Sequence, residues 1–110
     1  MRSYLIDEIS APDMDRVREY LKEKAIISGL EQVFWVQMPD DLLNETQLKH
    51  RECSPHVFAV ELGEDWLRLE FFVRSLKSMR CTCPGYATSA QRDHVISFAH
   101  EMIRSLGIST

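Results

Sequence analysis

The chain has 110 residues, a net charge of −4, a hydrophobic fraction of 45% and a charged fraction of 27%. This length fits a single domain, 1–110, that can bury a core without disulfides, and the composition is that of an ordinary globular protein. Acidic and basic residues are mixed, so no basic stripe is present to neutralise a phosphate backbone, and nucleic-acid binding is not expected. No apolar run approaches the ~20 residues of a membrane-spanning helix, so no membrane association is expected.

The N-terminus and the cysteines indicate the compartment. The opening residues meet Asp7 and Glu8 too early for a secretory signal. The chain has 3 cysteines, an odd number, and two of them are separated by one residue, so a disulfide framework is not expected. We therefore expect a cytoplasmic protein.

The first part of the chain predicts a strand over 1–9 and a long helix. Ser10 and Asp13 form a capping box, in which each side chain would bond to the backbone of the other residue. The spacing then predicts a helix over 11–28, with Gly29 as its natural end. Its core-facing stripe would be Met14, Val17, Leu21 and Ala25.

The next segment predicts a buried strand and short helices. Residues 33–38 are β-branched, aromatic and apolar on both faces, which is typical of a covered strand. Residues 39–43 predict a helical turn. Asn44 and Gln47 form a second capping box, so a short helix up to about Glu52 is expected.

Residues 57–62 and 66–75 predict a β-hairpin. A two-residue turn at 63–64 would pair Val60 with Leu67. A loop of odd length would place apolar residues of one strand opposite charged residues of the other, so an even loop is predicted. The outward face of the hairpin would then mix large apolar and charged side chains: Val57, Ala59, Glu61, Trp66, Arg68, Glu70, Phe72 and Arg74.

The C-terminal part predicts a loop and a second long helix. Residues 77–87 predict an irregular connection, and Thr88 and Gln91 form a third capping box. A helix over 89–106 is predicted, ended by Gly107. Its apolar stripe is Val95, Phe98, Ala99, Met102, Ile103 and Leu106.

The order of these elements is β-α-β-α-β-β-α. It predicts an α+β fold with a single, mostly antiparallel sheet and the two long helices packed on one face. Helical spacing on one element and alternation on the other predict one buried cluster that contains Leu69, Phe71, Phe98 and Met102.

All three cysteines and two of the four histidines lie in two short segments. His50, Cys53, Cys81 and Cys83 are residues of the kinds that zinc takes as tetrahedral ligands. The two segments flank the predicted hairpin, so they meet if both lie at its open end. Two features depart from common zinc motifs, because one pair has C-x-C spacing and the other has histidine in place of a cysteine. The alternative is that the cysteines are small buried side chains and His50 is a surface residue.

Cys81 and Cys83 also allow a thiol-dependent enzyme. Arg80 and the start of the last helix would favour a thiolate, and His94 or His100 could serve as a base, although nothing in the spacing shows it. Redox enzymes usually use C-x-x-C, and the alternative is two loop thiols without a role.

The leading hypothesis is a small cytoplasmic binding or interaction domain of unknown ligand, because no catalytic constellation is evident and no cofactor is implied. Trp66 and Phe72 on the outward hairpin face predict a homodimer through that face. The competing view is that Leu42, Leu43 and Leu48 of the short helices cover it. A zinc-binding domain that uses His50, Cys53, Cys81 and Cys83 is the first alternative function, and a thiol enzyme is the second.

Overall fold

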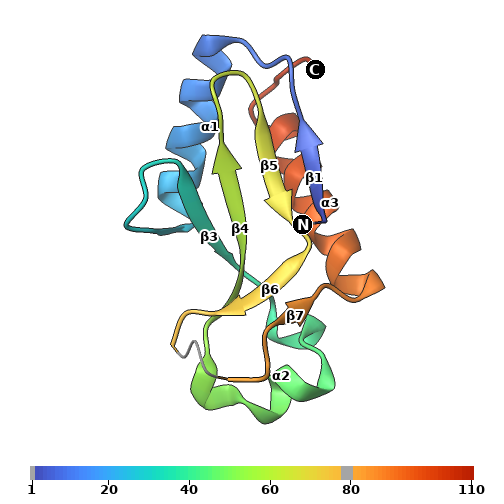
Figure 1. The fold of residues 1–110 in the computed structure, drawn as a ribbon. Helices are drawn as coiled ribbons and strands as arrows, with labels where there is room; N and C mark the ends of the chain where they lie inside the picture. Colours follow the sequence, from blue (N-terminus) through green and yellow to red (C-terminus); the bar gives the residue numbers. More distant parts are fainter. Residues whose placement is uncertain (1, 78–80) are drawn as a thin grey trace.

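The structure is a computed structural model that describes residues 2–77 and 81–110. A twisted antiparallel sheet of seven strands carries two long helices, α1 (Ala11–Lys24) and α3 (Ser89–Ser105) (Figure 1). The strands are β1 (Ser3–Ile6), β2 (Ile26–Ile27), β3 (Val33–Gln37), β4 (His56–Leu62), β5 (Leu67–Glu70), β6 (Phe72–Ser75) and β7 (Gly85–Tyr86). Between β3 and β4 lie the short helices η1 (Asp40–Leu42), α2 (Glu45–Lys49) and η2 (Arg51–Cys53).

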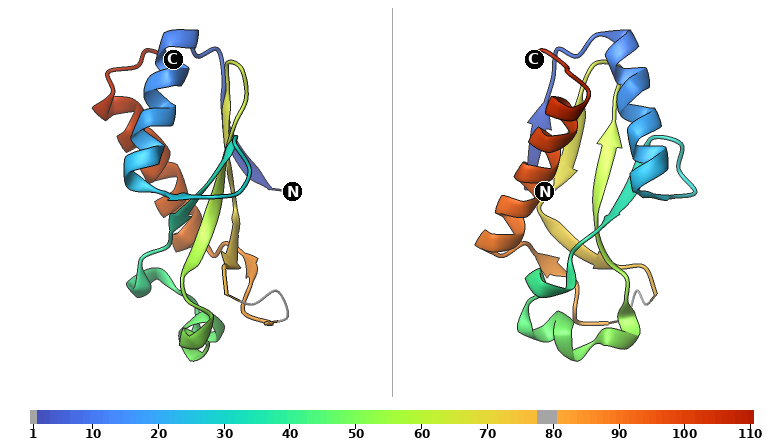
Figure 2. Two further views of the ribbon diagram at one scale, coloured as in Figure 1. Left: turned by 90° about the vertical axis from the view of Figure 1, so that its left-hand side faces the viewer. Right: turned by 180° about the vertical axis from the view of Figure 1, so that it is seen from behind.

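The sheet has the order β1-β5-β4-β3-β2, and β6 pairs with both β4 and β7. Figure 2 shows α1 and α3 on the same face of the sheet, so the predicted α+β architecture is confirmed. The short helices lie beyond one end of the sheet. In the part of the chain that is described, no helix is long and apolar enough to cross a membrane.

The core lies between the two long helices and the sheet. Leu69 and Met102 are fully buried in it, as predicted, whereas Phe71 and Phe98 are only partly buried and pack against its margin. Phe98 lies edge-on to Phe58, with ring centroids 5.8 Å apart. The predicted cluster therefore exists, but two of its four members are less buried than expected.

The helix α1 begins where predicted and ends earlier. Ser10 Oγ accepts from the Asp13 amide at 3.3 Å, but the Asp13 carboxylate pairs with Arg16, so only half of the predicted box is present. The helix ends at Lys24 rather than at residue 28, because Ile26–Ile27 leave it to pair with β3. The backbone of Ile26–Ile27 thus forms hydrogen bonds with β3 in place of those that one more turn of α1 would have formed.

The hairpin loop has four residues rather than two. The even parity is confirmed, but Leu62 pairs with Leu67 and Val60 with Leu69, so the predicted register was wrong by two residues. The loop closes with a bond from the Gly63 amide to the Trp66 carbonyl, 2.8 Å. The Trp66 ring covers Gly63 so closely that a Cβ there would overlap it.

The predicted strand 66–75 is interrupted at Phe71. Val60 pairs with Leu69 but Val57 pairs with Arg74, so three steps along β4 match five along the other strand and two residues form a bulge. The Phe71 amide bonds to the Arg2 carbonyl, 2.9 Å, so this backbone turns away from β4.

Two smaller expectations need correction. The helix expected up to Glu52 is two pieces, α2 and η2, because the His50 backbone leaves helical geometry between them. The connection 77–87 is not wholly irregular, because β7 pairs with β6.

Candidate metal centre

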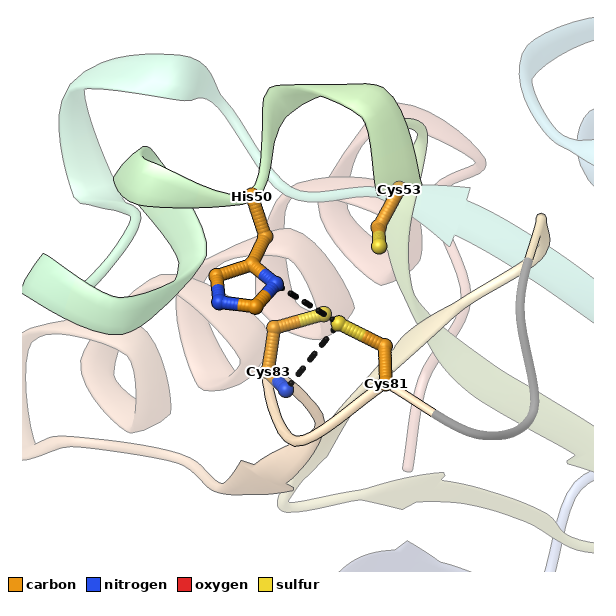
Figure 3. A group of neighbouring side chains, drawn as sticks. All are labelled: His50, Cys53, Cys81 and Cys83. Atoms are coloured by element: carbon orange, nitrogen blue, oxygen red, sulfur yellow. Dashed lines mark hydrogen bonds between the residues drawn. The ribbon is translucent and has the colours of Figure 1, made fainter.

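His50, Cys53, Cys81 and Cys83 meet at the open end of the β4–β6 hairpin (Figure 3). His50 lies between α2 and η2, Cys53 ends η2, and the other two lie between β6 and β7. His56 pairs with Ser75 across the hairpin end, and Ser75 Oγ donates to the Cys53 carbonyl at 2.5 Å. The metal site predicted from the sequence required both ligand-bearing segments to lie at the open end of the hairpin. The structure places them there.

The four potential ligand atoms are close enough for one ion. The Sγ atoms and one imidazole nitrogen all lie within 4.8 Å of one another. The bond lengths of a tetrahedral zinc site, ~2.3 Å to sulfur and ~2.0 Å to nitrogen, place neighbouring ligand atoms about 3.5 Å apart. Cys81 Sγ lies 2.8 Å from His50 Nδ1. Small side-chain movements are thus enough to form a tetrahedron.

The thiols differ in exposure and acidity. Cys53 and Cys83 are buried and Cys81 is half-buried. Hydrogen bonds, the strongest from Cys83, lower the pKa of Cys81 to about 7, and the Cys83 amide also donates to Cys81 Sγ at 3.4 Å. Burial raises the pKa of Cys83 to about 12. The cluster therefore favours one thiolate, on Cys81, before any cation neutralises it.

A buried amide network supports the cysteine loop from behind. Gln47 Nε2 donates to the Cys83 carbonyl at 3.3 Å, and Gln91 Nε2 donates to Gln47 Oε1 at 2.9 Å. Both glutamines are fully buried, and each also completes the capping box of its own helix, α2 or α3. The capping boxes were predicted, but the bond between them was not, because local spacing carries no sign of a contact between distant glutamines.

His56 lies at the start of β4 and is 2% exposed. Neither ring nitrogen has a hydrogen-bond partner among the described residues. Burial lowers its pKa, partly offset by Asp40. Burial of the ring thus disfavours its protonated form, and local spacing carries no sign that this histidine rather than another is buried.

The histidines suggested as bases for a thiol are engaged elsewhere. His94 packs edge-on against Phe58 and His100 Nε2 lies 2.7 Å from Tyr4 Oη. The imidazole in contact with a thiol is that of His50. Arg80, suggested as a stabiliser of a thiolate, lies outside the described residues.

In the part of the chain that the structure describes, both long helices lie on the face of the sheet opposite to the outward hairpin face (Figure 2). Leu42 and Leu43 pack against the helix-side core instead, and Leu48 is largely exposed, so the competing view that they cover this face was wrong. Trp66 and Phe72 are half-buried.

Charged neighbours on that face have partners within the chain. Arg68 pairs with Glu61, and Arg74 pairs with Glu70 at 2.8 Å. Arg74 also lies over the Phe72 ring, 5.0 Å from its centroid. The homodimer expected through this face stays a prediction.

Comparisons with protein-family models, curated proteins and solved structures found no match for this chain.

Proposed function

We propose that this chain is a small metal-binding domain in which His50, Cys53, Cys81 and Cys83 hold one Zn²⁺ ion. The observation that carries the proposal is the convergence of three thiols and one imidazole nitrogen within 4.8 Å, from two segments far apart in sequence. Three sulfurs and one nitrogen are a soft donor set that suits zinc better than magnesium or calcium.

The arrangement supports a structural rather than a catalytic ion. Four protein ligands fill a tetrahedron and leave no open position for a substrate. Groups around the ligands favour the metal-bound form, because the Cys83 amide donates to Cys81 Sγ and Gln47 fixes the Cys83 carbonyl. The ion would tie the segment before β4 to the segment after β6. This function agrees with the expectation of a domain without catalysis.

The test is metal analysis of the purified protein, followed by substitution with Co²⁺. We expect about one zinc per chain and, with Co²⁺, intense visible bands of tetrahedral geometry together with near-ultraviolet thiolate bands. His50→Ala and Cys83→Ser should lose these bands. His94→Ala is the matched control, because it removes a histidine of the same chain outside the cluster. A wild-type protein without metal, and whose melting temperature a chelator does not change, would contradict the proposal.

A second candidate function is thiol chemistry at Cys81. The specific observation is its contact with His50 Nδ1, 2.8 Å, together with a pKa lowered to about 7. The reaction of thiols with an alkylating reagent separates the two functions. A metal site protects all three thiols until a chelator is added, whereas a reactive Cys81 is modified rapidly in the protein as purified.

A further inference from the structure

The strand β1 leaves one edge of the sheet open. It is the last strand in the order β1-β5-β4-β3-β2, and among residues 2–77 and 81–110 only its β5 side is paired with another strand. A groove of about 550 Å³ runs along that edge, with the strand on one side and α3 on the other. Its lining includes Leu5, Asp7, His100 and Arg104. An open edge beside a groove is the kind of surface to which another extended strand adds.

The hydrogen-bond pattern shows which backbone groups are available. The Phe71 amide bonds to the Arg2 carbonyl, and these residues continue the register that pairs Tyr4 with Leu69. Bonded and non-bonded pairs alternate in an antiparallel ladder. The amide and carbonyl of Ser3 and of Leu5 therefore point away from β5, into the open edge. The Leu5 side chain is 54% exposed at the centre of this strand.

The segment is complementary to itself when it is reversed. Arg2 stands at one end of β1, and Asp7 and Glu8 stand at the other. In an antiparallel pair centred on Leu5, the end that carries Arg2 meets the end that carries the two carboxylates, and twofold symmetry repeats this contact. The Leu5 residues face each other and exchange both backbone bonds. A strand from an unrelated protein has no reason to share this charge order.

We propose that a second copy of this chain adds its own β1 antiparallel to β1 and joins the two sheets into one. The proposal is independent of the metal site, which lies at the other end of the strands from Leu62 and Leu67. It differs from a dimer through the sheet face that carries Trp66 and Phe72, because it uses backbone bonds of the β1 edge. Thr110 Oγ1, which donates to the Asp7 carbonyl at 2.8 Å, marks the end of the free edge.

Sedimentation equilibrium of the full chain over micromolar concentrations tests the proposal. The wild type should dimerise, and Leu5→Lys should weaken the dimer at least tenfold by placing two ammonium groups together. Leu30→Lys is the matched control, because Leu30 is also an exposed leucine, at 66%, and lies in the loop between β2 and β3, away from the β1 edge. Circular dichroism should show all variants folded, since both leucines are exposed.

A charge exchange identifies the register. Arg2→Glu and Glu8→Arg should each raise the dimer Kd by about tenfold, through like charges that occur twice across the axis. The double variant should restore the wild-type Kd. A monomeric wild type would overturn the proposal, whether or not another protein or peptide occupies the edge. A second outcome would also overturn the proposal: the Leu5→Lys variant stays dimeric, whereas the double variant Trp66→Glu, Phe72→Glu dissociates. The interface would then lie on the sheet face.

Discussion

Replacement of Gln91 by methionine tests the buried amide network that joins α2, α3 and the cysteine loop. Methionine has similar length and volume, so little cavity is left and the change is mainly one of hydrogen bonding. Gln91 Nε2 donates to the Leu42 carbonyl and to Gln47 Oε1, both at 2.9 Å, and Gln91 Oε1 accepts from the Thr88 amide at 3.0 Å.

The variant leaves two backbone groups without these partners, the Leu42 carbonyl and the Thr88 amide, whereas Gln47 Oε1 keeps its bond from the Asn44 amide. The Leu42 carbonyl is half-buried, whereas Thr88 is exposed and water can reach its amide, so most of the cost comes from the Leu42 carbonyl. The free energy of unfolding should therefore fall by about 1–3 kcal/mol. Urea unfolding in the presence of a chelator measures this without a contribution from metal. Gln37→Met, at an exposed position that ends β3, is the matched control and should change stability by less than about 0.5 kcal/mol. A loss below about 1 kcal/mol for Gln91→Met, with an unchanged m-value, would refute the reasoning.

Three further predictions concern the core, the hairpin loop and pH. Met102→Ala removes a fully buried side chain and should lower the free energy of unfolding by about 2–5 kcal/mol in the same assay; a loss under about 1 kcal/mol would mean that α3 does not pack as described. Gly63→Ala should displace the Trp66 ring and shift its fluorescence to the red in a Trp35→Phe background, and an unchanged spectrum would contradict the overlap. Burial lowers the pKa of His56, so the unfolded chain takes up its proton first and stability should fall as the pH drops below about 6.5, until the folded protein is protonated as well. His56→Leu should flatten that part of the pH profile measured with a chelator present, and parallel profiles would count against the assignment.

The architecture was predictable because the strongest local signals belong to the elements that define it. Caps and apolar stripes located α1 and α3, and their burial on one face of the sheet follows from those stripes. The end of α1 was not predictable in the same way. Residues 25–28 contain no helix breaker, and the ladder that takes Ile26–Ile27 out of the helix is a contact with β3.

In the hairpin, the alternation of apolar and polar residues determines only the parity of the strand register. A shift by one residue would bury Arg68, so parity was predictable. A shift by two keeps the same residues on the same face, and alternation cannot detect it. Contacts of Trp66 favour the register with a four-residue loop, because its ring lies over Gly63 and its carbonyl accepts the bond that closes this loop.

The candidate site was predictable in its residue types and not in its surroundings. The clustering of cysteine and histidine in two segments was visible in the chain, and their meeting followed from the hairpin that separates them. The contact of Gln47 with the Cys83 carbonyl, and the burial of His56 without a partner among the described residues, depend on tertiary packing that no local spacing encodes.

The contacts that join the ends of β4 and β6 farthest from the turn affect where local unfolding of the hairpin begins. An isolated hairpin frays from its free ends, where the strands enter and leave. Here the His50–Cys81 contact and the Ser75–Cys53 bond join those ends even before a metal is considered. Amide protons of Val57 and Arg74, a bonded pair at this end, should then exchange with solvent more slowly than those beside the loop at Gly63, the reverse of the usual gradient. The hairpin is expected to unzip from its turn.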